Sequence, residues 1–415
     1  MNTLLFALIG ALRSHRWLRF LGVAYILSSL GNGLTQVIIF GQLLHWHASP
    51  ATLTIVYMLS MLPSFIGSIW GEILCKKTSP LRILIFTEIS GLLALVFPLY
   101  GSLYHNVPAL LVVQCIEALL SGITYPALTL LFKRGLRHDE LPAATAMETI
   151  IFASQVLLGT GLGVLLFDLI AAQHLLAIDA LSFTASAILL MMSAAAFCGA
   201  ERCPTEATPV KQESLWRVIS PLQKRSILLL PALAAVGSPA MALLPALAQE
   251  IRPEDSAGLA LPLLFARSLG QLCGPLMLDA SKLQQYAVNN RLLLTCLSLF
   301  IGSYFLLPLS AGYPYTGLVL IFSAHMASNI IFALGTFGIL RNFPQTQVAK
   351  ASAMSWRVRV MTATVFIGIT SAMAQYFGAW YALYCMSLFG LGVVGVLLWL
   401  NRERTLNKVN LRLRE

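Results

Sequence analysis

The stretch that decides the fold is PALLVVQCIEALLSGITYPALTLLF, residues 108–132, which is followed at once by Lys133 and Arg134. Its only charged residue is Glu117. A helix of this length crosses the roughly 30 Å of hydrocarbon in a bilayer, because each residue adds about 1.5 Å. The stretch therefore predicts a transmembrane helix with a basic loop at its end.

Blocks of this kind recur along the chain. Hydrophobic residues make up 58% of the sequence and charged residues 11%, whereas soluble domains carry about 25% charged residues. Pro, Gly and charged residues separate the blocks. We expect twelve membrane-spanning helices, at residues 18–44, 50–75, 82–103, 108–132, 142–168, 174–199, 225–250, 257–280, 291–310, 314–340, 351–375 and 378–400.

The predicted fold class is an all-α integral membrane protein. Backbone inside a bilayer must satisfy its own hydrogen bonds, which favours helices, and the short alternating segments typical of membrane β-barrels do not occur. The net charge of +10 would suit nucleic acid. However, the basic residues lie in short clusters between apolar blocks, so we expect no nucleic-acid partner.

The basic clusters also predict the orientation of the chain. Lys and Arg gather in every second loop and at both termini, whereas the intervening loops contain only Arg252. Cytoplasmic loops carry the excess of Lys and Arg, so both termini are expected in the cytoplasm. The cytoplasmic basic residues are Arg13, Arg16, Arg19, Lys76, Lys77, Arg82, Lys133, Arg134, Arg137, Arg202, Lys211, Arg217, Lys224, Arg225, Lys282, Arg291, Arg341, Lys350, Arg357, Arg359, Arg402, Arg404, Lys408, Arg412 and Arg414.

The two halves of the chain resemble each other. Gly67 and Gly71 in the first half match Gly270 and Gly274 in the second, and LPAATAM at 141–147 matches VAKASAM at 348–354. These echoes predict two pseudo-symmetric six-helix bundles. The expected domains are an N-terminal segment at 1–17, bundles at 18–199 and 225–400, a cytoplasmic linker at 200–224 and a basic tail at 401–415.

Other classes of protein are not favoured by the motifs. The seven cysteines have no disulfide or zinc spacing, so no metal or cofactor is expected. No Gly-Lys-Ser/Thr phosphate loop and no channel filter is present. His174 and Asp179 have the spacing of an acyltransferase motif but no accompanying anion site, so an enzyme is not expected.

Polar residues recur at helical spacing within three of the spans, so each set shares one helix face. An ionisable group in the hydrocarbon costs at least about 2.5–3.5 kcal/mol, so each needs a reason. The alternative for the Ser and Thr members is hydrogen bonding between helices. The three sets are Tyr25, Ser29, Asn32 and Gln36; Gln114, Glu117, Ser121 and Thr124; and His325, Ser328, Asn329 and Thr336.

Several segments resemble the major facilitator superfamily, in the branch that contains enterobactin-type siderophore exporters and drug exporters. They are residues 28–34 (SSLGNGL), 49–51, 62–63, 67–74 with Lys76 and Lys77, 140–146, and 177–190 (AIDALSFTASAILL). The resemblance covers most of the first half and, in the second, mainly the layout. It implies a bacterial inner-membrane antiporter that works by alternating access, with the first, fourth, seventh and tenth spans lining the cavity.

The chain also departs from that family. Cys75 stands where the loop after the second span usually has Asp, and Asn32 stands where the first span often has an acid. The Arg expected in the fourth span is not evident, and Glu117 lies nearby instead. The coupling residues are therefore sought among this chain's own acids.

The candidate site residues follow from these faces. A carboxyl in hydrocarbon favours its protonated form, which would suit Glu117 as a proton carrier, although it could instead be a protonated structural group. Arg267 could bind an anion or pair with a Glu, His325 could be a switch or a neutral structural group, and Arg357 could gate or reach the cytoplasm. We expect substrate contacts from Asn32, Gln36, Gln114, Arg267, His325 and Asn329, and proton-coupling or gating roles for Glu117, Glu148, Glu88 and Arg357.

The resulting expectation is a monomeric, proton-coupled exporter of a small amphiphilic or anionic metabolite such as a siderophore. Its partners are that substrate, protons and the lipid bilayer. Two alternatives stay open: a lysophospholipid flippase, because Met147–Glu148 resembles a pair in lysophospholipid transporters, and a siderophore importer, because topology does not define direction.

Overall fold

The computed structural model describes residues 3–46, 58–167, 169–197, 215–251, 256–310 and 313–400. Over these residues the secondary structure is helical, with no β-strand. The chain divides into two compact units, 1–207 with 345–360 (unit 1) and 208–344 with 361–415 (unit 2). The expected basic tail, most of the expected linker and Arg252 lie outside the described residues.

Nine of the described helical segments are long and apolar enough to cross a membrane, which confirms a multi-pass helical protein. The three other expected spans overlap described helices that are not among the nine, α4 (Pro63–Lys77), α13 (Ser256–Leu276) and α15 (Asn290–Leu306). Twelve spans and cytoplasmic termini therefore stay predictions. The nine segments are Arg16–Leu43, Pro80–Tyr104, Val107–Gly135, Leu141–Phe167, Ala172–Phe197, Pro221–Leu243, Tyr315–Asn342, Gln345–Phe377 and Ala379–Val396.

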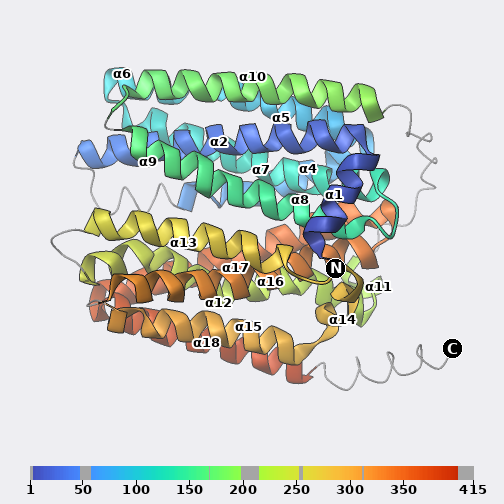
Figure 1. The fold of residues 1–415 in the computed structure, drawn as a ribbon. Helices are drawn as coiled ribbons and strands as arrows, with labels where there is room; N and C mark the ends of the chain where they lie inside the picture. Colours follow the sequence, from blue (N-terminus) through green and yellow to red (C-terminus); the bar gives the residue numbers. More distant parts are fainter. Residues whose placement is uncertain are drawn as a thin grey trace. The chain divides into compact units, whose positions relative to one another are not determined.

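Unit 1 is a bundle in which the long helices run side by side (Figure 1, blue to green). Helix α2 packs against α10, α4 against α7, and α5 against both α7 and α10. Its elements are α1 (Leu4–Ser14), α2 (Arg16–His45), α4, α5 (Pro80–Ala94), α6 (Val96–Tyr104), α7 (Val107–Gly135), α8 (Leu141–Ser154), the π-helix η1 (Gln155–Thr160), α9 (Gly161–Phe167), α10 (Ala172–Phe197), and residues 345–360 of α17 (Gln345–Phe377).

Local sequence explains where these helices begin. Pro63, Pro80 and Pro142 stand in the first turns of α4, α5 and α8, where a missing N–H costs nothing. The Asn106 side chain caps α7 by accepting a hydrogen bond from the Ala109 N–H at 3.0 Å. His105, with φ at 53°, ends α6 in the left-handed region. Helix α7 therefore starts afresh after a tight turn.

Unit 2 is built around α16 (Pro314–Asn342), against which α12 (Pro221–Ile251), α13 and α15 pack. Its core includes the fully buried side chains of Phe300, Tyr304 and Ile321. The remaining elements are α11 (Leu215–Val218), η2 (Ala280–Lys282), α14 (Leu283–Val288), η3 (Leu307–Ser310), residues 361–377 of α17, and α18 (Ala379–Leu400).

The glycines that the two halves share perform the same task in each unit. A Cβ on Gly67 would collide with the Leu119 carbonyl of α7, and one on Gly270 would collide with the Phe322 carbonyl of α16. Small residues allow helices to approach closely in a membrane, where packing replaces the hydrophobic effect as the attraction between them. The α4–α7 and α13–α16 contacts are thus equivalent.

Candidate functional site

A polar pocket of about 140 Å³ lies within unit 1, and we call it the amide pocket. Four carboxamides contribute to it: Asn32 and Gln36 from α2, Gln114 from α7 and Gln155 from η1. The remaining lining residues are Ser60, Glu117, Ala118 and Ser121. Four of the residues expected at the site, Asn32, Gln36, Gln114 and Glu117, therefore meet in one cavity. Their roles in binding or coupling stay predictions.

Two of the lining residues, both on α7, carry unpaired polar atoms. Gln114 is 3% exposed, and its Nε2 has no hydrogen-bond partner among the described residues. The buried Glu117 Oε1 likewise has none. The two residues are three apart on α7 and so share a face. Both atoms are buried, and a buried polar group without a partner is costly.

The amide pocket connects to a second carboxyl through hydrogen bonds. Asn32 Nδ2 donates to Ser28 Oγ at 3.4 Å, and Ser28 Oγ donates to Glu88 Oε1 at 3.1 Å. Glu88, on α5, is 5% exposed and forms no ion pair in the described part of the chain. Its proton-coupling or gating role stays a prediction.

A third carboxyl, Asp179 on α10, was not among the residues expected at the site. It is fully buried, accepts a hydrogen bond from Thr35 of α2 and one from Ser182 at 3.2 Å, and interacts electrostatically with Glu117 and Glu88. A Cβ on Gly31 would collide with its carboxylate. The sequence signals that could have identified Asp179 were Ser182, three residues later on the same helix, and the small residue Gly31 on α2.

The π-helix η1 also escaped prediction. Its first residue, Gln155, reaches the amide pocket, and its Gly159 packs against Gly33 of α2. Short π-helical turns inside α-helices are frequently found at functional sites. The glycines at 159, 161 and 163 were visible in the sequence, but they do not by themselves indicate a change of helix type.

Glu148 lies away from the amide pocket, on α8. It is 7% exposed, neither carboxylate oxygen has a hydrogen-bond partner among the described residues, and it interacts electrostatically with Tyr125. The Tyr125 ring lies 4.5 Å from the Trp356 ring. Glu148 is therefore near the contact between α7 and α17 and forms no ion pair in the described residues.

Arg357 pairs with an acid that sequence reasoning did not single out. Its Nη2 lies 3.0 Å from Glu72 Oε2 of α4, within unit 1. Beside it, Trp356 Nε1 donates to Ser64 Oγ at 3.0 Å, and the Arg359 guanidinium lies 5.1 Å from the Trp356 ring centre. Arg357 is thus held by an ion pair rather than reaching only toward solvent. Residues so far apart in the chain give no sequence signal of pairing.

The other three expected substrate contacts lie in unit 2, and we call them, with Tyr304, the histidine cluster. His325 is 1% exposed, and its Nε2 lies 2.9 Å from the Tyr304 hydroxyl. Asn329 Nδ2 donates to the His325 carbonyl at 3.1 Å, and Arg267 acts electrostatically on the ring. Arg267 forms no ion pair among the described residues, so the alternative of a partner Glu finds no support there.

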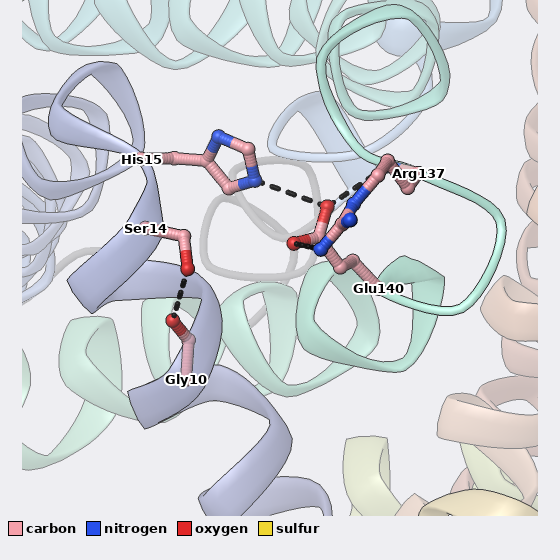
Figure 2. A network of polar contacts seen from close by, with 5 residues as sticks. All are labelled: Gly10, Ser14, His15, Arg137 and Glu140. Atoms are coloured by element: carbon pink, nitrogen blue, oxygen red, sulfur yellow. Dashed lines mark hydrogen bonds and ion pairs between the residues drawn. The ribbon is translucent and has the colours of Figure 1, made fainter.

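A further polar network lies outside the spans, where α1 meets α8 (Figure 2). His15 Nε2 lies 3.0 Å from Glu140 Oε2, and Arg137 donates to Glu140 from both its backbone N–H and its guanidinium at 3.0 Å. Burial acts to raise the pKa of Glu140, but the hydrogen bonds from Arg137 and the His15 contact lower it to about 2. This network anchors α1 and does not reach the amide pocket.

Comparison with known sequences gives little. No family model matches the chain. A stretch of 74 residues, 18% of the chain, is 64% identical to an uncharacterised 29.9 kDa protein from the region 3′ of crtE in Pseudescherichia vulneris. The match spans about a quarter (27%) of that relative's length.

Solved structures are more informative. A bacterial homologue of the iron transporter ferroportin superposes with a TM-score of 0.67 at 14% identity, over 91% of this chain and 97% of that one. The human organic anion transporter MFSD10 superposes with a TM-score of 0.66 at 10% identity, over 91% of this chain and 98% of that one. The E. coli fucose:proton symporter FucP superposes with a TM-score of 0.63 at 14% identity, over 91% of this chain and 96% of that one. At these identities the likeness shows the fold alone, which is that of major facilitator transporters.

Proposed function

We propose that this chain is a secondary active transporter, with no enzymatic role, and that the amide pocket is part of its substrate path. The observation that carries the proposal is a polar pocket, containing an unpaired carboxyl, among helices long enough to span a bilayer. A helix bundle that had only to be stable would gain nothing from such a pocket, because unpaired polar groups are costly in hydrocarbon. The transporter fold supports the same reading.

The proposed driving force is the proton gradient, with Glu117 as the carrier. Glu117 lines the amide pocket, and its buried Oε1 has no hydrogen-bond partner among the described residues. Intramembrane acids that face a cavity mark proton relays in many transporters. One of the proteins with this fold is named as a proton symporter.

The proposed direction is export, and the proposed substrate is a small amphiphilic metabolite, with a metal-free siderophore as the first compound to test. Both rest on the resemblance of residues 28–34 and 177–190 to siderophore exporters. The proposed location is a bacterial inner membrane, and the proposed state is a monomer. Lysophospholipid flipping and siderophore import are the competing outcomes of the test.

The test is transport in proteoliposomes with an imposed pH gradient, using a panel of metal-free siderophores and a lysophospholipid. Wild type is compared with Glu117→Gln and with Glu140→Gln, a matched control whose carboxyl lies outside the spans. We expect gradient-driven siderophore movement that is lost in Glu117→Gln and retained in Glu140→Gln. Movement that survives Glu117→Gln would exclude this carrier, and movement of lysophospholipid alone would exclude the siderophore.

A further inference from the structure

We propose that the amide pocket is a subsite for an uncharged hydrogen-bonding group, a hydroxyl or carboxamide, and that it rejects carboxylates, phosphates and ammonium groups. The inference rests on the proposed function, because it names the chemistry that the same site selects. It narrows the expected substrate: the part of the molecule seated in unit 1 is neutral, even if another part is charged.

The lining supplies donors and acceptors in comparable numbers. Each of the four carboxamides, Asn32, Gln36, Gln114 and Gln155, can both donate and accept, and so can the hydroxyls of Ser60 and Ser121. Such a surface pairs with groups that also do both, which hydroxyls and carboxamides are. A carboxylate or phosphate only accepts, so it would leave the lining acceptors unpaired.

The charge of the lining gives the same selection. Among the residues that the structure describes, no Lys, Arg, His or aromatic side chain lines the amide pocket, and the one ionisable group in its lining is the acid Glu117. An anion would lose its hydration without gaining a cation, next to a carboxyl of like charge. An ammonium ion would find a single carboxyl and no aromatic ring, whereas buried cations generally require close pairing or aromatic faces.

One ligand hydroxyl would satisfy both unpaired atoms of α7. Gln114 Nε2 is a donor and Glu117 Oε1 is an acceptor when ionised, and both are buried and without partners among the described residues. A hydroxyl accepts from the first and donates to the second. Because Gln114 and Glu117 lie three residues apart on one helix face, a single small group can reach both.

The size of the pocket limits how much of the ligand enters. Cavities for drug-sized ligands are about 300–1,000 Å³, and this one is about 140 Å³. It therefore accommodates one ring or branch of a larger molecule. A small neutral ring with vicinal hydroxyls, as in catechol amides and in sugars, has the required chemistry.

The experiment measures equilibrium binding of two matched probe series to the purified full chain in nanodiscs. One series is 2,3-dihydroxybenzamide, 2,3-dihydroxybenzylamine and 2,3-dihydroxybenzoate, and the other is methyl glucoside, glucosamine and glucuronate. Within each series the ring is constant and the charge is neutral, positive or negative. We expect the neutral probe to bind at least about tenfold more tightly than both charged probes in one series, as one or two lost hydrogen bonds would give.

Variants assign the binding to this pocket. Gln114→Leu and Gln155→Leu each remove one lining amide and should weaken the neutral probe about tenfold. The control is Gln271→Leu in unit 2, where the side chain is 2% exposed and its Oε1 is also unpaired in the described residues. It makes the same change at a matched burial and should leave the affinity unchanged. Two variants from different helices guard against one of them failing to fold.

The inference is overturned if a charged probe binds most tightly in both series, if no probe binds at millimolar concentration, or if the control loses affinity as the pocket variants do. These outcomes can be distinguished from a failure of the proposed function. Neutral binding without gradient-driven transport in proteoliposomes would exclude the transporter and keep the subsite. Transport with charge-selective binding would keep the transporter and exclude the subsite.

Discussion

The polar interiors of the two units differ in the sign of their charge. The ionisable groups in and behind the amide pocket of unit 1, Glu117, Glu88 and Asp179, are all acids. In unit 2 the histidine cluster contains Arg267 and His325, and no acid occurs among the described side chains of α12, α13, α15, α16 and α18. Two bundles that share a layout and a glycine packing pattern thus contain different ionisable groups, and this difference can be tested in each unit separately.

The largest effect should come from the feature that the units share. Gly67→Leu and Gly270→Leu each force a side chain into a backbone carbonyl of the neighbouring helix. Overpacking typically costs about 1–3 kcal/mol, and rigid backbone on both sides leaves little room to relax. We expect both variants to lose most of the monodisperse protein in size-exclusion chromatography. The control is Gly302→Leu, because no atom lies within 4 Å of a Cβ added at that position. If only one of the two variants loses monodisperse protein, the α4–α7 and α13–α16 contacts are not equivalent.

The next largest effect should separate the two charges. Asp179 interacts electrostatically with the proposed carrier Glu117, so Asp179→Asn should weaken gradient-driven uptake by about 5- to 150-fold, the usual range of coupling between two sites, while substrate exchange without a gradient continues. Arg267→Gln should instead reduce the exchange itself. Both are measured as gradient-driven uptake and as counterflow in the same proteoliposomes. If the two variants show the same pattern, the assignment of acids and bases to separate tasks is wrong.

A smaller effect tests the histidine cluster as a structural element. Tyr304→Phe keeps the ring but leaves His325 Nε2 without its 2.9 Å partner. A buried group deprived of its hydrogen bond costs about 1–3 kcal/mol, so Tm should fall by a few degrees. The measurement is thermal unfolding in nanodiscs, with Tyr376→Phe as the control because Tyr376 is 79% exposed. An unchanged Tm in Tyr304→Phe would mean that the contact is not formed.

The smallest expected effect is on stability at low pH and comes from Glu140, which lies outside both interiors. The pKa of Glu140 is about 2 in the folded chain, below its ordinary value of 4.5. Its stabilising contribution is therefore complete above about pH 4.5 and is lost as the pH falls toward 2. Thermal unfolding between pH 3 and 7 should show a decline below pH 4.5 that is shallower in Glu140→Gln. The same slope in both proteins would contradict the role of the network in Figure 2.

Sequence periodicity gave most of the fold because it reports on single helices. The run at 108–132 became α7, and Gln114 and Glu117 share a face of it because residues three or four apart must do so. Asn32 and Gln36 were placed on one face of α2 for the same reason. The family resemblance, which implies that the first and fourth spans line the cavity, led us to expect these two faces to form one path, and they do line one pocket.

What the sequence did not give are relations between helices. Asp179 was not chosen because the neighbour that it contacts, Thr35 of α2, lies on another helix. Glu72 pairs with Arg357, and Trp356 donates a hydrogen bond to Ser64. Both contacts were overlooked because residues so distant in the chain leave no periodic signal. Gln155 was missed because its position depends on a π-helix, and hydrogen-bond type is not written in residue spacing.

The π-helix η1 has a consequence for reading related sequences. Each of its turns contains one residue more than an α-helical turn, because its hydrogen bonds run from i to i+5. A relative that forms a regular α-helix here should align with a one-residue gap at 155–160, because the wider turn accommodates the additional residue and keeps the side chains that follow in register. The presence or absence of that single residue should therefore sort relatives into those that present an amide to the pocket and those that do not.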